Sequence, residues 1–275
     1  PTTCPVDCRP AEAGETVAPT PESIPTQTQT SDAPLLLTTM THMEGGFEDN
    51  RNQAVFEKHI QQLTYGMDMA DEYPDVVIGC VGGGSNFSGI AFPFLRENLR
   101  NGQRTKLLAV EPSSTPSLTK GLYSFDYGDT AQMAPIIKMH TLGHDFIPPS
   151  IHAGGLRYHG MAPQLSALYD AGLIDAVSVD QLDVFEAGKL FAQVEGILPA
   201  PESSHAIRVA INQALEAKKL GEKRVILFNL SGHGHFDLTS YNAYNAGKLE
   251  NYQLPDNFVE SIPDHLPKID MSYSN

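Results

Sequence analysis

One short stretch limits the folds open to this chain more than any other, and it reads "IGCVGGGSNFSG" from Ile78 to Gly89. The β-branched run just before it, "PDVVIGC" (74–80), predicts a buried strand that stops at three consecutive glycines. The spacing of apolar residues then becomes helical, and we expect a helix from Ser88 to Arg100. A strand that turns through glycine into a helix is typical of α/β proteins with a parallel sheet.

Later runs continue this pattern. "KLLAVEP" (106–112) predicts a second buried strand, so that strand, helix and strand form a βαβ unit. "RVILFNLSGHGHFD" (224–237) predicts a further strand, from Val225 to Leu230, that runs into another glycine turn. Helical spacing recurs over 181–194 and 202–220. The sequence therefore predicts an α/β fold in three layers, with a parallel sheet between helices.

Composition divides the chain into three parts. Residues 1–48 are rich in Thr, Pro and Glu, and we expect a disordered or foreign segment there. Residues 49–250 make up the predicted α/β domain, which opens with weak helical spacing over 50–72. The Gly-, Pro- and His-rich stretch 112–160 predicts a functional loop region. Residues 251–275 are polar and interrupted by proline, so we expect a loosely held tail.

Charge and cysteine content exclude several functions. The chain of 275 residues carries 33 Asp and Glu against 18 Lys and Arg, a formal net charge of −15. This balance argues against nucleic acid or an anionic membrane as a partner, and the apolar runs are too short to cross a bilayer. Three cysteines without zinc spacing form neither a disulfide framework nor a metal site. We therefore expect a cytoplasmic protein without a metal held by side chains.

The first glycine turn has the features of an anion site. Backbone amides gather at a helix N-terminus, the dipole favours a phosphate, and glycine lets the anion approach closely. The turn has no lysine at the Walker A position, and the spacing of its glycines does not match the G-x-G-x-x-G motif of dinucleotide-binding proteins. A tight turn without a ligand is the alternative. The expected phosphate-binding residues are Gly82, Gly83, Gly84, Ser85 and Asn86.

The second glycine turn offers a hydroxyl. Ser231 follows the strand that ends at Leu230, and strand C-termini face the ligand crevice in open α/β sheets. If both turns face one crevice, one holds a phosphate and the other meets a ring, as pyridoxal phosphate requires. Glu202 lies at the start of a predicted helix in "ILPAPESSHA" (197–206). The ordinary explanation for a glutamate at this position is that its carboxylate interacts favourably with the helix dipole.

Several segments, in the same order, resemble the β subunit of tryptophan synthase, and most closely its divergent second form. They are "EYPDVVIGCVGGGSNFSGIAFPF", "AVEPSSTPSLTKG", "MHTLGHDFIPPSIHAGGLRYHG", "EGILPAPESSHAI" and "FNLSGHGHFD". The resemblance implies a fold-type-II pyridoxal phosphate enzyme, of which this stretch is similar to the larger domain, so that the fold is incomplete. It also implies a β-replacement that joins L-serine and indole into L-tryptophan.

The resemblance assigns roles to single residues. It implies that residues 82–86 bind the cofactor phosphate, that Ser231 meets the pyridine nitrogen, and that Glu202 is a catalytic group beside the ring. Arg157 is either a ligand of a substrate carboxylate or a surface arginine. The expected partners are a second copy of the chain or a tryptophan synthase α subunit. A monovalent cation held by backbone carbonyls is a further expectation.

The lysine that binds the cofactor in this family is not found. Lys58, in "FEKHIQ", is the one lysine before Gly82, and its context does not match the family's motif. An amine is needed for the covalent chemistry, so we expect a truncated chain that is inactive on its own. The alternative is a non-catalytic homologue that binds the cofactor phosphate, or acts as a scaffold, beside a full-length partner.

Overall fold

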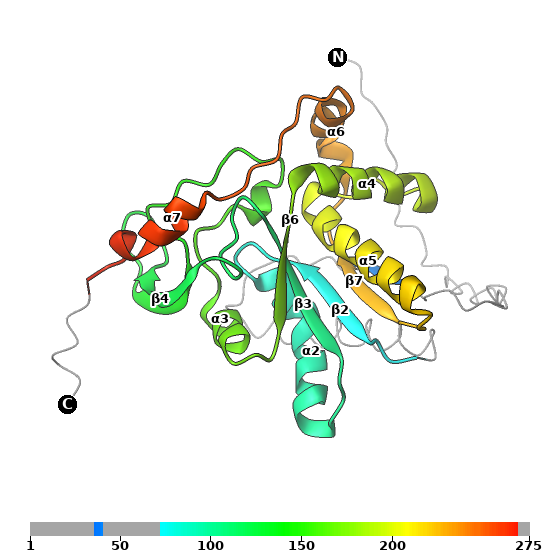
Figure 1. The fold of residues 1–275 in the computed structure, drawn as a ribbon, viewed down its shortest axis with the longest axis horizontal. Helices are drawn as coiled ribbons and strands as arrows, with labels where there is room; N and C mark the ends of the chain where they lie inside the picture. The colour runs from blue at the N-terminus through cyan, green and yellow to red at the C-terminus, as the bar shows by residue number, and fades with distance from the viewer. Residues whose placement is uncertain (1–35, 41–71, 269–275) are drawn as a thin grey trace, which may run out of the picture. The chain divides into compact units, whose positions relative to one another are not determined.

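The described part of the chain forms a parallel sheet. The computed structural model describes residues 36–40 and 72–268, which belong to one compact unit, Ala33–Asn275. Within these residues the five-stranded sheet has the order β1-β7-β2-β3-β6, and every neighbouring pair is parallel (Figure 1). Its strands are β1 (Leu36–Met40), β2 (Val76–Cys80), β3 (Lys106–Pro112), β6 (Asp175–Val179) and β7 (Ile226–Leu230).

Helices connect these strands, and two further helices follow β7. They are α2 (Ser85–Asn101), α3 (Pro163–Asp170), α4 (Gln181–Glu195), α5 (Pro201–Leu220), α6 (Leu238–Asn245) and α7 (Asp256–Ser261), with short 3-10 turns at Gly154–Leu156, Gly234–Phe236 and Ile262–His265. α2 begins at Ser85 rather than at the predicted Ser88, because Ser85 and Asn86 themselves form its first turn. Each predicted strand and each later helix is present at its expected place.

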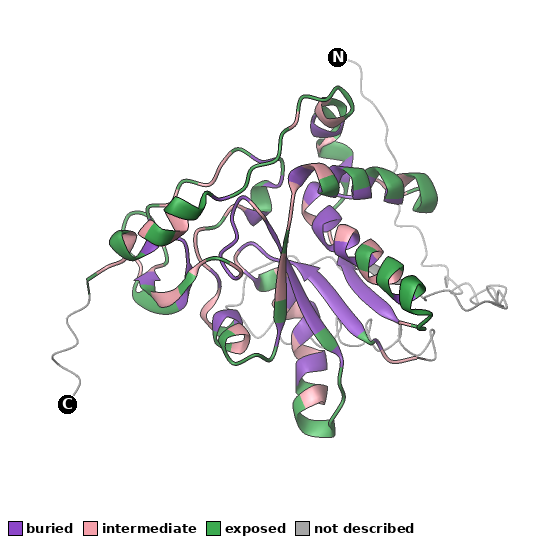
Figure 2. Cartoon of the chain, viewed as in Figure 1, coloured by how far each residue is buried: buried purple, intermediate pink, exposed green. Residues whose placement is uncertain are grey.

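The two faces of the sheet are covered by different helices. Successive residues of a strand point to opposite faces. Val77 accordingly packs with Phe87 of α2, whereas its neighbour Ile78 packs with Ile207 of α5. The strands at the centre are buried on both faces, whereas α2 and α5 are buried where they cover the sheet and exposed at their far ends (Figure 2). The predicted three-layer α/β architecture is therefore confirmed.

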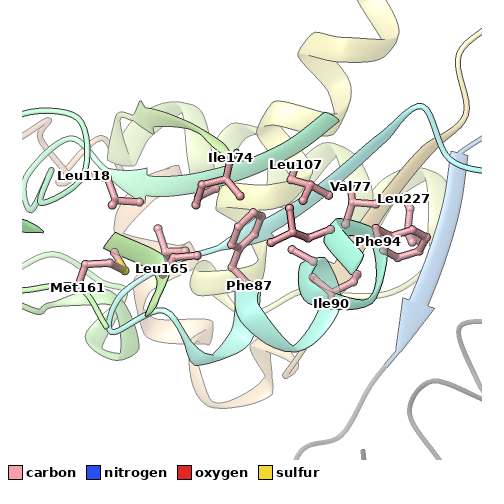
Figure 3. Packing of buried hydrophobic residues seen from close by; sticks show 14 residues of the cluster. Val77, Phe87, Ile90, Phe94, Leu107, Leu118, Met161, Leu165, Ile174 and Leu227 are labelled. Atoms are coloured by element: carbon pink, nitrogen blue, oxygen red, sulfur yellow. The ribbon is translucent and has the colours of Figure 1, made fainter. Parts of the chain in front are cut away.

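The core beneath α2 holds the glycine turn in place. Phe87, Ile90 and Phe94, at helical spacing, lie against Leu107 and Leu227 of the sheet (Figure 3). All five side chains are almost wholly buried. Burial of one such side chain contributes about 1.5–3 kcal/mol. The start of α2, and with it the glycine turn, is thus fixed to the sheet.

The stretch 112–160 contains more regular structure than its composition predicts. An antiparallel hairpin joins β4 (Leu122–Tyr127) to β5 (Ile136–Thr141). The fully buried Asp126 accepts a hydrogen bond from Thr141 Oγ1 (2.6 Å), and its Oδ1 lies 2.8 Å from His144 Nδ1. Buried polar groups are thereby satisfied inside a region that otherwise reads as a loop.

Two short segments lie in the regions predicted to be poorly structured. Leu36–Met40, which includes part of an apolar patch, pairs in parallel with β7. In the C-terminal region, Leu254 and Ile262 are buried against Leu142. Most of the weakly helical stretch 50–72 lies outside the described residues. Within the described part of the chain, every helix is too short or too polar to cross a membrane.

Candidate functional site

The first glycine turn joins β2 to α2 with an open helix N-terminus. Gly84 is the N-cap, and its φ of 107° lies in the left-handed region that favours glycine. No side chain caps α2, and its first turn carries no acidic residue. The amide dipoles of the 17-residue helix are therefore free to meet an anion from outside the helix.

Glycine is required at position 82 by the close approach of another loop. A Cβ atom at Gly82 would lie 2.6 Å from the carbonyl oxygen of Gly155 and 2.7 Å from the Cα of Leu156. Both are backbone atoms, which cannot move aside as a flexible side chain can. The Tyr158 ring lies beside Gly83, 3.5 Å from the place of its absent Cβ. The "HAGGLRYHG" stretch thus forms one wall of the glycine turn.

The second glycine turn reaches the first directly. Asn86 Nδ2 donates a hydrogen bond of 2.8 Å to Ser231 Oγ, across 145 positions of sequence. β2 and β7 are adjacent parallel strands, so the turns that follow them lie at the same edge of the sheet. The structure therefore brings the predicted phosphate loop and the predicted ring-binding serine together.

Glu202 belongs to the same constellation. It lies in the first turn of α5, and its Oε1 accepts a hydrogen bond of 2.9 Å from the backbone amide of Gly155. Burial raises the pKa of Asp237, and it raises the pKa of the Cys80 thiol to about 12. The charge of Glu202 is the second cause of both shifts. Glu202 therefore lies close enough to Cys80 and Asp237 to contribute to both shifts.

Arg157 has a different neighbourhood. Its Nη2 donates a hydrogen bond of 2.7 Å to the carbonyl of Pro148, and its Nε is buried without a hydrogen-bond partner. The guanidinium thus supports the loop before it, and its role as a substrate ligand stays a prediction. A carbonyl site for a monovalent cation stays a prediction as well.

Sequence reasoning missed three members of the site. Ser203 Oγ donates to the carbonyl of Ser231, Cys80 Sγ donates to Asn86 Oδ1 at 3.7 Å, and the Gly155 amide binds Glu202. Cys80 looks like an ordinary buried thiol at the end of a strand. No pattern in the sequence marks these contacts, because each depends on segments that only the fold brings together.

A comparison of the sequence with protein families decides the class. Residues 43–232 match the model of the pyridoxal-phosphate dependent enzyme family. The chain belongs to this family. Among solved structures, a crystal structure of a T.th. threonine deaminase aligns with a TM-score of 0.48 and 17% identity, over 68% of this chain and 55% of that one.

Curated members of the family are more similar. The chain is 60% identical over 184 residues to tryptophan synthase beta chain 2 of Methanosarcina mazei, covering 67% of this chain and 42% of that one. It is 59% identical to tryptophan synthase beta chain 2 of Aquifex aeolicus (66% and 43% covered) and 57% identical to the tryptophan synthase beta chain of Pyrococcus horikoshii (66% and 40%). The chain thus spans about two fifths of the length of these relatives.

The site fits the cofactor of the family. Pyridoxal phosphate carries a phosphate group and a pyridine nitrogen on one small ring, so the groups that bind them must lie close together. The uncapped N-terminus of α2 suits a phosphate, and the hydrogen bond between Asn86 and Ser231 shows that a hydroxyl lies within reach of it. The chemistry of these donors therefore agrees with the family.

Proposed function

We propose that this chain supplies the cofactor-binding part of a tryptophan synthase β-type active site, which joins L-serine and indole into L-tryptophan by β-replacement. The observation that carries the proposal is the convergence of the two glycine turns through Asn86 and Ser231. The relatives that are 57–60% identical over about two thirds of the chain bear the name tryptophan synthase beta chain, which supports this reaction over others of the family.

The glycine turn holds the phosphate in this proposal. Gly84 is the N-cap of α2 and Ser85 and Asn86 are its first residues, and we assign the phosphate to their backbone amides together with those of Gly82 and Gly83 directly before them. The positive end of the helix dipole adds to their attraction for a dianion. Three of these five residues are glycines, so no side chain at those positions covers the amides. These residues bind and orient, and they take no part in proton transfer.

Ser231 sets the character of the ring-binding site. Pyridoxal phosphate supplies an electron sink for the departure of the β-leaving group. A serine hydroxyl donates a hydrogen bond to an unprotonated ring nitrogen, whereas a carboxylate would require that nitrogen to hold a proton. Ser231 therefore favours a milder electron sink, which suits loss of a β-substituent.

Glu202 is the acid–base group of the proposal. Its Oε1 is held by the Gly155 amide, so the carboxylate is fixed beside the two turns. The loop that carries Gly155 also packs on Gly82, which links the position of Glu202 to that of the phosphate loop. We assign Glu202 to holding or moving a proton beside the ring.

The amine that binds the cofactor comes from elsewhere in this proposal. Several lysines of the described residues have other partners: Lys106 contacts Asp175, Lys120 contacts Asp256, Lys189 contacts Asn245 and Lys223 contacts Glu72. Lys58 lies outside the described residues. We propose that a different, lysine-bearing chain completes the site in the cytoplasm. A second copy of this chain or a tryptophan synthase α subunit is a further proposed partner and does not supply the lysine.

Two measurements on the full chain test this function. Binding of 4′-deoxypyridoxine 5′-phosphate, which has no aldehyde, reports the phosphate and ring sites without covalent capture. Borohydride treatment after addition of pyridoxal phosphate, followed by peptide mapping, reports a lysine adduct. We expect binding that weakens at least tenfold in Gly84→Ala, and tryptophan formation only when a lysine-bearing partner is added.

The outcomes are distinct. Absence of ligand binding by the wild-type chain would overturn the proposal. A trapped adduct at Lys58 would overturn only its last part, because the chain would then carry its own amine. Binding without tryptophan formation, whichever partner is added, would favour the alternative of a non-catalytic homologue.

A further inference from the structure

The side chains of Cys80, Asn86 and Ser231 form a chain of two hydrogen bonds at the carboxyl ends of β2 and β7. We call this chain the relay. Cys80, the last residue of β2, donates from Sγ to Asn86 Oδ1 over 3.7 Å. Asn86, in the first turn of α2, donates from Nδ2 to Ser231 Oγ over 2.8 Å. The amide of Asn86 is therefore occupied on both sides by groups from adjacent strands.

The relay has a direction. Cys80 is 1% exposed, and burial raises the pKa of its thiol to about 12, so it remains protonated and acts as a donor. A donor on one side fixes the amide oxygen of Asn86 there and turns its NH₂ toward Ser231. Ser231 Oγ is then an acceptor in this bond. Its own proton is left for an acceptor outside the relay, since a hydroxyl has one proton to donate.

The backbone of Ser231 is held as well. Ser203, in the first turn of α5, donates from Oγ to the carbonyl of Ser231. Gly232 follows with a φ of 75°, which turns the chain away immediately after the serine. α5 thus fixes where Ser231 lies, and α2 fixes where its hydroxyl points. Contacts from two helices leave little freedom to the side chain.

We propose that Asn86 is a positioning residue that holds the Ser231 hydroxyl as a donor toward the cofactor's ring nitrogen, so that the site selects rings with an unprotonated nitrogen. The inference rests on the proposed function. It gives Asn86 a role in the ring site beyond its backbone amide in the phosphate loop. Cys80 acts one step further back, by fixing which end of the amide faces Ser231.

A pair of ligands isolates this role. 4′-Deoxypyridoxine 5′-phosphate has the ring nitrogen, and its 1-deaza analogue has a CH group there; both carry the phosphate and neither reacts with lysine. We expect the wild-type chain to prefer the first by several-fold to about tenfold, as one hydrogen bond gives. Asn86→Ala and Cys80→Ala reduce this preference toward unity, whereas Cys80→Ser retains it.

Ser85→Ala is the matched control. Ser85 precedes Asn86 in the same turn of α2 but lies outside the relay, so its loss weakens both ligands equally and leaves their ratio unchanged. Circular dichroism and melting temperature show whether each variant is folded. For the variants that keep the fold, we compare the ratio of the affinities for the two ligands. A general loss of phosphate binding affects both affinities and cancels in this ratio.

Asn86→Asp gives a second readout. A carboxylate accepts from the Ser231 hydroxyl and so turns its proton away from the ring, leaving a lone pair that favours a protonated nitrogen. The ¹⁵N chemical shift of bound, labelled ligand at neutral pH is expected to move to the pyridinium range in this variant. In the wild type it stays in the unprotonated range.

The two proposals fail in different ways. If the wild-type chain binds the ligand with nitrogen but Asn86→Ala keeps the full preference and Asn86→Asp leaves the ¹⁵N shift unchanged, the relay has no positioning role and the proposed function stands. If the wild-type chain binds neither ligand, the proposed function fails and this inference fails with it.

Discussion

The carboxylate of Glu202 and the backbone amide of Gly155 form a hydrogen bond of 2.9 Å that connects α5 to the loop over the glycine turn. The same loop places Gly155 O and Leu156 Cα against Gly82. A single chain of contacts therefore runs from the start of α5, through one loop, to the start of α2. A substitution at the start of α5 is therefore expected to affect the start of α2, and the reverse is expected as well.

Removal of the Glu202 carboxylate tests the first contact. In Glu202→Ala the Gly155 amide loses its acceptor, and we expect the free energy of unfolding to fall by about 1 kcal/mol, since this amide is exposed enough to regain water. Glu202→Gln keeps an oxygen at the same position and is expected to be close to wild type. Urea denaturation of the three proteins measures the difference. Equal stability of the Ala and Gln variants would contradict a structural role for this bond.

Gly82→Ala tests the close approach of the loop. The added Cβ would lie 2.6 Å from a backbone oxygen, so the loop or the turn must shift, at a cost of about 1–3 kcal/mol. Gly154→Ala is the matched control from the same loop, because its Cβ meets nothing within 4 Å. We expect only the first variant to lose stability and ligand binding together. Similar denaturation midpoints for both variants would show that the loop moves freely.

The sequence is sufficient to predict where the site lies. The turns at Gly82–Gly84 and at Ser231 each follow a short apolar run, and carboxyl ends of parallel strands share one edge of a sheet. The strand β6, "DAVSV", escapes prediction because it is an edge strand with partly exposed residues and few large apolar side chains. Local composition has little to say about such a strand.

The contacts within the site could not be predicted in the same way. The bond from Asn86 to Ser231 depends on the register that pairs Val76 with Ile226, which no local pattern specifies. The Gly, Pro and His residues around the hairpin β4–β5 make it hard to predict, and its buried Asp126 is favourable because Thr141, His144 and the Tyr127 amide hydrogen-bond to it. Side-chain partners distant in sequence are set by packing, after the elements have formed.

Glu111 is expected to make the protein less stable as pH rises. Burial raises the pKa of this carboxyl from 4.5 to about 7, although Leu118 N and the Thr119 amide and hydroxyl donate to it. Between pH 4.5 and 7 the folded state then holds a proton that the unfolded state has lost, so stability falls as pH increases. In Glu111→Gln this decrease of the free energy of unfolding with rising pH should be absent. An identical slope in wild type and variant, from urea titrations across this range, would rule the effect out.

His205 is expected to act in the opposite direction. It is 2% exposed in α5, its Nδ1 lies 2.8 Å from the Pro201 carbonyl, and burial lowers its pKa from 6.5 to about 4. As pH falls from 6.5 to 4 the unfolded state takes up a proton that the folded state does not, and stability is lost, on the order of 3 kcal/mol in total.

His205→Gln, which cannot titrate, should start from a lower stability but lose this acid dependence, whereas replacement of the exposed His235 by Gln should leave the wild-type slope intact. Unfolding free energies at closely spaced pH values separate the two variants. As pH rises, the His205 effect increases stability, whereas the Glu111 effect decreases it over nearly the same range. Each single variant removes one of the two effects. The double variant Glu111→Gln/His205→Gln removes both, so its unfolding free energy should depend less on pH than that of either single variant. A double variant as steep as one of its parents would mean that other groups dominate the acid response.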